Sequence, residues 1–219
     1  MTKLKITSLL MLGTFLGACA ATTPTTTTPT IPAGAIGTTS ANADGTYTIT
    51  VNSTTYELGA GIVAAGNTLR FPTPNYARGF SNADVTAIGG MLNDGTAFAG
   101  ISGTASSSVP TGTATYNTRY TMVYPTASGA PIIGGTDGAT TVSVDFVAGT
   151  VTNTSPYLNI VGAISGVTFS GTATCNYPTN GCAATVPMEG GFYGTGGIAG
   201  VYSGTGLAGA FYGTQNPNL

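Results

Sequence analysis

The chain has no histidine and no tryptophan, and only 5% of its 219 residues are charged. Without histidine it lacks the usual general base of Ser-His-acid and Cys-His catalytic sites and the commonest protein ligand for metal ions. Its seven acidic residues are widely spaced, and no pair has an obvious glycosidase arrangement. These absences predict a protein that is not an enzyme and that holds no metal ion.

Cationic residues are scarce as well. Lys3 and Lys5 are the only lysines, and the chain beyond residue 18 keeps Arg70, Arg78 and Arg119 against seven acids, three minus seven, or a net charge of −4. Three scattered arginines cannot neutralise the phosphates of a nucleic acid, so nucleic acid is excluded as a partner. An anionic membrane surface is equally poorly matched, so membrane attachment would depend on a lipid.

The N-terminus supplies such an attachment point. Two lysines precede the apolar run from Ile6 to Phe15, and the small residues Gly17 and Ala18 lead into Cys19. A basic start, a short apolar stretch and small residues before the cut are the features of a secretory signal. With cysteine after the cut, the pattern resembles a bacterial lipobox. We therefore expect removal of residues 1–18 and lipidation of Cys19; an ordinary signal peptide that contains a cysteine is the alternative.

The segment that follows is of low complexity. Residues 19–33 are mostly threonine, proline and alanine, a composition that stays extended and carries too little apolar surface to fold. We interpret this segment as a tether behind the lipidated cysteine. Beyond the signal, no apolar stretch approaches the roughly 20 residues of a transmembrane helix.

Two cysteines remain after Cys19. Cys175 and Cys182 enclose a turn-rich hexapeptide, and an even pair in an exported protein predicts a disulfide. A zinc site is the weaker alternative, because two cysteines without histidine cannot complete one.

Almost all of the remaining chain has the alternating pattern of β-strands. Thr46–Leu58 predicts a hairpin that reverses at Asn52 and Ser53. Short alternating runs then recur between turn residues, as in an antiparallel meander. These runs are Val85–Met91, Gly95–Gly103, Gly112–Tyr124, Thr140–Phe146, Thr150–Asn153, Ile160–Ile164, Val167–Thr174, Met188–Gly194, Ile198–Tyr202 and Leu207–Tyr212. A sandwich and a barrel both fit, and we favour a barrel because closure removes the edges of thinly packed, glycine-rich strands.

The last third carries a more specific order of motifs. Asp145-Phe146 is followed by Phe169-Ser170-Gly171, by Glu189–Gly194 with Ile198–Tyr202, and by the closing run Leu207–Gly213. This order resembles the C-terminal β-barrel of surface lipoproteins related to transferrin-binding protein B and factor H binding protein. It departs from them in having no acid after Tyr193-Gly194, where relatives usually carry one.

The resemblance implies an all-β fold with two parts. An eight-stranded antiparallel β-barrel would occupy residues 81–219, behind a small N-terminal β-rich handle at 34–80, as a single lobe. The phenylalanines Phe169, Phe192 and Phe211 would fill the barrel interior.

The resemblance also implies a function. The protein would be a monomeric, lipid-anchored protein of the bacterial outer membrane, displayed at the cell surface, that captures haem, an iron-carrying protein or another host protein. No cofactor is predicted, and haem is the one candidate left open. The alternative is a structural envelope lipoprotein without a specific ligand.

No binding residue can be carried over from the family, so the residues themselves must supply candidates. Tyrosine can ligate haem iron and is a frequent anchor of protein interfaces. Tyr120, Tyr124, Tyr157 and Tyr177 lie near predicted loops or strand ends and are the predicted binding residues. Simple packing in or on the barrel is the alternative for each of them.

Overall fold

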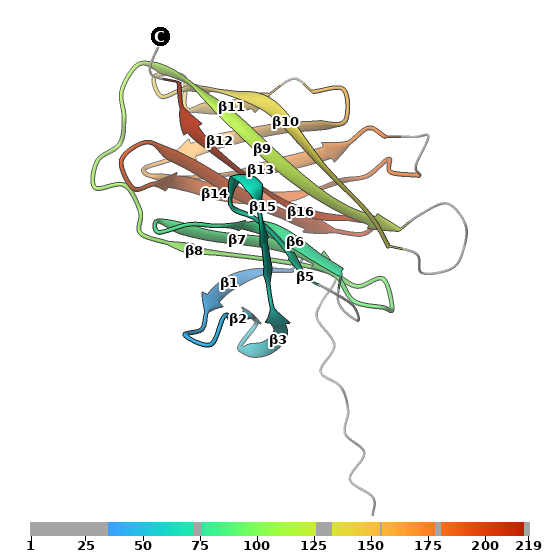
Figure 1. Cartoon of the computed structure of the whole chain (residues 1–219). Helices are drawn as coiled ribbons and strands as arrows, with labels where there is room; N and C mark the ends of the chain where they lie inside the picture. The colour runs from blue at the N-terminus through green and yellow to red at the C-terminus, as the bar shows by residue number, and fades with distance from the viewer. Residues whose placement is uncertain (1–34, 72–75, 126–132, 154, 178–180, 217–219) are drawn as a thin grey trace, which may run out of the picture.

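The computed structural model describes residues 35–71, 76–125, 133–153, 155–177 and 181–216, with residues 133–136 described by their backbone. Cys19, the predicted signal and the predicted tether lie outside these residues. The described chain is all-β, apart from one 3₁₀ turn, η1 (Ala65–Asn67), and forms a handle stacked below a barrel (Figure 1). Among the described residues there is no helix with the length and hydrophobicity of a membrane span.

The barrel is closed and antiparallel throughout, in the order β10-β11-β12-β13-β14-β15-β16-β9. The final strand β16 pairs with β9, which completes the cylinder. This arrangement confirms the predicted eight-stranded barrel. Its strands are β9 (Thr113–Pro125), β10 (Ile133–Asp145), β11 (Thr150–Asn153), β12 (Leu158–Ser165), β13 (Thr168–Cys175), β14 (Thr185–Tyr193), β15 (Gly197–Gly204) and β16 (Leu207–Gln215).

Aromatic rings fill the inside of the barrel. The Phe192 ring lies centrally, with centroid distances of 5.0 Å to Phe146, 5.7 Å to Phe169 and 6.2 Å to Tyr116. Phe169 in turn stacks on Phe211 at 6.1 Å. The prediction that Phe169, Phe192 and Phe211 occupy the interior is therefore confirmed.

Glycines make room for these rings. On neighbouring strands, Gly200 lies directly opposite Phe211, and a Cβ at Gly200 would lie 2.5 Å from the ring of Phe211. The same directly opposed pairing of a glycine with an aromatic residue recurs at Phe169–Gly190, Tyr202–Gly209, Tyr120–Gly138 and Phe98–Gly90. A ring that lies across a glycine covers backbone that no side chain protects, so few large residues suffice to pack thin strands.

The handle is a second sheet of eight strands, in the order β3-β2-β1-β8-β7-β6-β5-β4. It curls so that the β2–β3 hairpin packs back over β5–β8 and encloses a core of its own, which includes Tyr47, Ile49, Leu69 and Phe98. The strands are β1 (Ala35–Ala41), β2 (Thr46–Val51), β3 (Thr54–Ala60), β4 (Ile62–Ala64), β5 (Thr68–Phe71), β6 (Tyr76–Ser81), β7 (Val85–Met91) and β8 (Ala97–Gly103).

Two local predictions for the handle can be compared with this structure. The reversal at Asn52-Ser53 is confirmed: both residues have positive φ, 49° and 65°, as the two-residue turn of a tight hairpin requires. The boundary between residues 80 and 81 is wrong. Val85–Met91 and Gly95–Gly103, expected among the barrel strands, form β7 and β8, and these strands pair with each other, with β6 and with β1.

The cause of this error is that β7 is buried on both faces. One face contributes Ile88 to the handle core, and the other contributes Ala87 to the interface with the barrel. A strand buried on both faces carries no local sign of the sheet to which it belongs. The handle therefore extends to Gly103, and the barrel begins at Thr113.

Small residues let the handle and the barrel approach closely. Strands β6–β8 lie against β9, β15 and β16 through an apolar layer that is rich in alanine. At its centre the two backbones touch, because a Cβ at Gly89 would lie 2.5 Å from Gly209 Cα. The buried side chains of this layer are Phe80, Ala87, Met91, Ala97, Ala99, Val123, Val201, Ala208 and Ala210.

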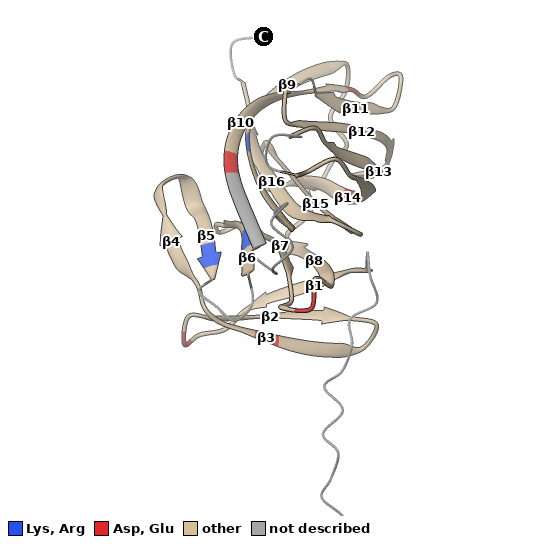
Figure 2. Cartoon of the chain, turned by 90° about the vertical axis from the view of Figure 1, so that its right-hand side faces the viewer, with Lys and Arg blue, Asp and Glu red and all other residues tan. Residues whose placement is uncertain are grey.

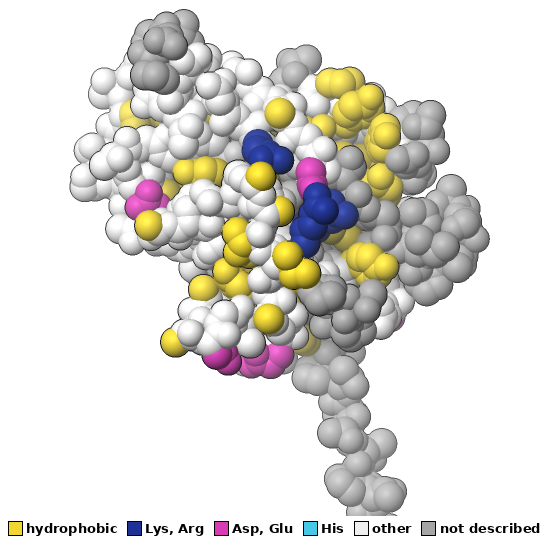
Figure 3. All heavy atoms as spheres, viewed as in Figure 1, with side chains coloured by type: hydrophobic (Ala, Val, Ile, Leu, Met, Phe, Trp, Pro, Cys, Tyr) yellow, Lys and Arg dark blue, Asp and Glu magenta, His cyan; other side chains and the backbone are white. Residues whose placement is uncertain are grey.

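Two ion pairs, which share one aspartate, join the handle to the barrel at one side. Asp137 on β10 accepts hydrogen bonds from Arg70 of β5 at 2.6 Å and from Arg78 of β6 at 2.8 Å, one to each carboxylate oxygen (Figures 2 and 3). Arg119 on β9 donates to the carbonyl of Ala65 in η1 at 3.0 Å. Because Arg70 is half exposed, these contacts fix the orientation of the handle more than they add stability.

Candidate binding site

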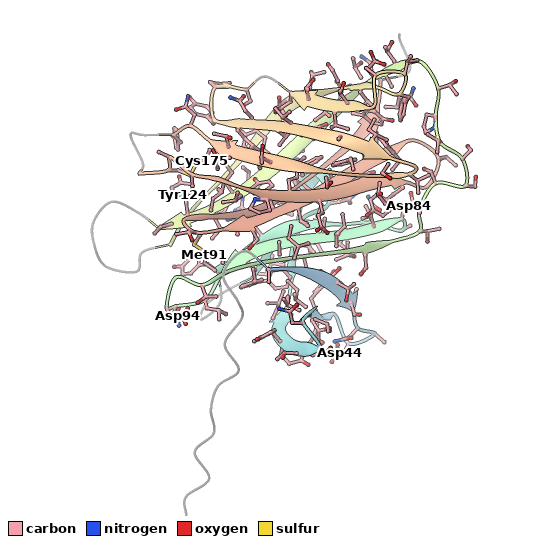
Figure 4. The ribbon with its side chains drawn as sticks, turned by 180° about the vertical axis from the view of Figure 1, so that it is seen from behind. Asp44, Asp84, Met91, Asp94, Tyr124 and Cys175 are labelled. Atoms are coloured by element: carbon pink, nitrogen blue, oxygen red, sulfur yellow. A yellow bond between two sulfur atoms is a disulfide. The ribbon has the colours of Figure 1, made fainter. Side chains whose placement is uncertain are left out.

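The two ends of the barrel differ in chemistry. At one end β9 and β13 finish, and Tyr124 and Cys175 lie there; Asp84 marks the opposite end (Figure 4). We name the first the tyrosine end, defined by Tyr124, Tyr157, Tyr177 and the two cysteines. Three of the four predicted binding tyrosines and the predicted disulfide converge on it.

The disulfide is present and shapes this end. Cys175 and Cys182 are bonded, with their Cα atoms 5.8 Å apart, and both are buried. Inside the loop, the Tyr177 amide donates to the carbonyl of Cys182 at 2.8 Å, and the Cys182 amide donates back at 3.1 Å. The Asn176 amide donates to the carbonyl of Tyr157 at 2.9 Å. The loop between β13 and β14 is thus fixed to the start of β12.

Three of the four predicted tyrosines form one cluster. The ring of Tyr177 lies 4.6 Å from that of Tyr157 and 6.4 Å from that of Tyr124, edge to face in both cases. Tyr124 is buried at the base, Tyr177 is partly buried, and Tyr157 is 43% exposed. The cluster therefore runs from the barrel core to the surface.

Tyr120 does not join this cluster. It lies four residues before Tyr124 in β9, is 3% exposed, and packs over Gly138 on the neighbouring strand. Its position inside the cylinder makes it a core residue. From the sequence, Tyr120 and Tyr124 share a face of one strand and look alike; depth within the barrel separates them.

One exposed apolar residue of β12 was not among the predicted ones. Val161 on β12 is 59% exposed, because its neighbours Ile160 and Gly162 occupy the inward positions of the strand. An apolar residue on the outward face of a strand was the available signal for it. Tyr157, which directly precedes β12, is also exposed, and tyrosine is enriched at protein interfaces.

In the described part of the tyrosine end, the rings already pack on one another. Tyr177 lies edge to face against both Tyr157 and Tyr124. Across the same residues, no three acidic, histidine or cysteine side chains gather as a metal site would require. The cluster presents the side chain of Tyr157 to solvent.

Known proteins were compared with this chain by sequence and by fold. No family model matches the sequence, and no curated protein sequence matches it. Among solved structures, transferrin-binding protein B (TbpB) from Haemophilus parasuis superposes with a TM-score of 0.50 at 15% identity over 77% of this chain. The chain has the fold of one TbpB lobe. The match spans 40% of the length of that protein.

A second TbpB structure, isotype 1 from serogroup B Neisseria meningitidis, matches at 16% identity and a TM-score of 0.48, over 74% of this chain and 38% of its own. The TbpB-like fold confirms the architecture implied by the motif order, a barrel with a handle beside it. At such low identity the likeness concerns the fold, and function has to be argued from this chain.

Proposed function

We propose that this protein is a monomeric, lipid-anchored lipoprotein of the bacterial outer membrane that captures a protein partner at the cell surface through the tyrosine end of its barrel. The proposal has two supports. The fold is that of a lobe of proteins named for binding transferrin. The first 19 residues have the pattern of a secretory signal followed by a lipobox-like cysteine.

Tyr157 is the observation on which the binding site depends. It is 43% exposed, and its ring is held at 4.6 Å against Tyr177, which the disulfide-closed loop positions. A tyrosine that is already fixed loses little side-chain entropy on binding and buries a large amphipathic surface. Given the TbpB-like fold, an iron-carrying host protein is the partner to test first.

We expect a soluble form beginning at Thr22, which contains every described residue, to bind transferrin or haemoglobin saturably in biolayer interferometry. Replacement of Tyr157 by alanine should weaken this binding about 30-fold, as for a central interface residue. The matched control is Tyr76→Ala, since Tyr76 on the handle is similarly exposed, at 37%. Haemin, followed at its Soret band, should give no saturable shift.

Two results would contradict this assignment. Equal losses for Tyr157→Ala and Tyr76→Ala would remove the tyrosine end as the binding site. No saturable binding to any host protein would favour the alternative function, a structural envelope lipoprotein without a specific ligand.

Membrane attachment is tested at Cys19. With Cys19→Ala, the chain loses the thiol that receives lipid, so incorporation of labelled palmitate should disappear and the protein should move to the soluble fraction. The double variant Cys175→Ala/Cys182→Ala serves as control, because it removes the two disulfide-bonded cysteines and should keep the label. Continued labelling of Cys19→Ala would overturn the lipobox interpretation.

A further inference from the structure

The barrel has a second feature of note at the end opposite the tyrosines. There a cavity of about 310 Å³ opens between the connection from handle to barrel and the β14–β15 turn. Of the eleven residues that line it, none carries a charge. Hydroxyl, amide and aromatic side chains dominate its wall: Ser107, Ser108, Thr195, Gln215, Tyr116 and Phe192.

Backbone hydrogen bonds hold this cavity open. The Ser106 amide donates to the carbonyl of Phe192 at 2.9 Å, and the Gly194 amide donates to that of Thr104 at 3.1 Å. The Ser106 hydroxyl donates to the carbonyl of Gly194 at 2.9 Å, and the Gln215 amide to that of Gly196 at the same distance. Both walls are therefore fixed before any ligand arrives, which lowers the cost of binding.

Tyr116 is the one aromatic residue of the wall that also carries a hydroxyl. Its side chain lines the cavity and is 1% exposed. Burial raises the pKa of Tyr116, so the hydroxyl stays protonated and remains a donor. A ligand with acceptor oxygens can therefore receive a hydrogen bond from this wall.

We propose that this cavity binds an uncharged, polyhydroxylated molecule of the size of one sugar ring, free or as the terminal residue of a glycan. An ionic ligand would lose its hydration against a wall that offers no opposite charge. A purely apolar ligand would displace water from the hydroxyl and amide groups of this wall without replacing its hydrogen bonds. The volume lies at the lower end of the range for small-molecule sites, which restricts the ligand to a single ring.

The test uses ligand-observed NMR on the soluble form beginning at Thr22. The probes are the methyl glycosides of glucose, galactose, mannose and N-acetylglucosamine, with glucuronate as a charged probe. At least one neutral probe should bind saturably, and glucuronate should not. Tyr116→Phe keeps the ring and removes only the hydroxyl, so it should weaken binding roughly tenfold. Ser107→Trp, at an exposed position of the wall, should abolish binding by filling the cavity.

The matched control is Tyr47→Phe, which removes a hydroxyl from the handle core and should leave binding unchanged. A trisaccharide that ends in the bound sugar separates the two sources: tighter binding than the monosaccharide indicates a glycan, and equal binding a free sugar. The proposal is overturned if no neutral probe binds, if glucuronate binds as well, or if Tyr116→Phe binds like the unaltered protein. None of these outcomes depends on the tyrosine end.

Discussion

Replacement of Gly89 by valine is expected to lower the free energy of unfolding by about 3 kcal/mol, because it forces the handle away from the barrel. A Cβ at this position would lie 2.5 Å from Gly209 Cα, and backbone, unlike the tip of a side chain, cannot turn aside. Separation would expose the alanine-rich layer on both surfaces. Urea unfolding followed by circular dichroism measures the loss, and limited proteolysis at 104–112 detects the released handle.

Gly95→Asn is the control for this substitution. Gly95 has φ of +85° and open space around it, and asparagine tolerates this conformation better than most residues. We expect a change within about 0.5 kcal/mol there. A Gly89→Val variant as stable as Gly95→Asn would show that the handle can shift on the barrel without loss.

Above pH 10, the protein should lose stability steeply. Burial raises the pKa of Tyr202 well above its usual value, with a further contribution from Tyr120, and the Tyr202 hydroxyl donates to the carbonyl of Thr121 at 2.7 Å. Burial also raises the pKa of Tyr116, Tyr193 and Tyr212.

The direction follows from proton binding. Below about pH 10 these tyrosines are protonated in both states and contribute no pH dependence. Above it the unfolded chain releases protons that the folded chain keeps, so the free energy of unfolding falls, by up to about 1.4 kcal/mol per pH unit for Tyr202 alone. Absorbance of tyrosinate should show one class that ionises near pH 10 and another that ionises only on unfolding.

Tyr202→Phe isolates the contribution of that residue. It removes the titrating group at the cost of the hydrogen bond to Thr121, so stability at neutral pH should fall by about 1 kcal/mol while the slope above pH 10 becomes shallower. An unchanged slope in this variant would assign the alkaline loss to other groups.

Local patterns in the sequence predicted strands well and their partners poorly. Val85–Met91 and Thr150–Asn153 coincide with β7 and β11. Their alternation and turn residues are local properties. The sheet to which β7 belongs is decided by its pairing with β6 and β8. Its second buried face packs on barrel strands that come later in the sequence, so neither property can be seen in the local pattern of β7. The start of β10 was missed because Ile133–Ala139 is glycine-rich and has no alternation, yet it pairs along β9 over its full length.

In the candidate site, too, local features could be predicted and contacts between distant segments could not. The turn-rich segment between Cys175 and Cys182 was enough to predict the disulfide, since the two residues are close in sequence. The convergence of Tyr124, Tyr157 and Tyr177 was not predictable, because it requires β9, β12 and β13 to meet at one end of a closed cylinder. The cavity beside Tyr116 was also not predictable from the sequence. Its walls come from a connection and a turn whose serines and glycines look like ordinary loop composition.

In both the handle and the barrel, the first strand in sequence pairs with the last one, which fixes the order in which the molecule can form. The handle sheet cannot be completed before β8 is made, because β1 pairs in parallel with β8. The barrel cannot close before β16 is made, because β16 is the strand that pairs with β9. The surface on which the handle docks also includes β16. During synthesis the handle can therefore close first, whereas the cylinder and the joint between the two parts appear together, when the last residues emerge. A chain cut short before Leu207 would keep two open strand edges, and such edges favour aggregation.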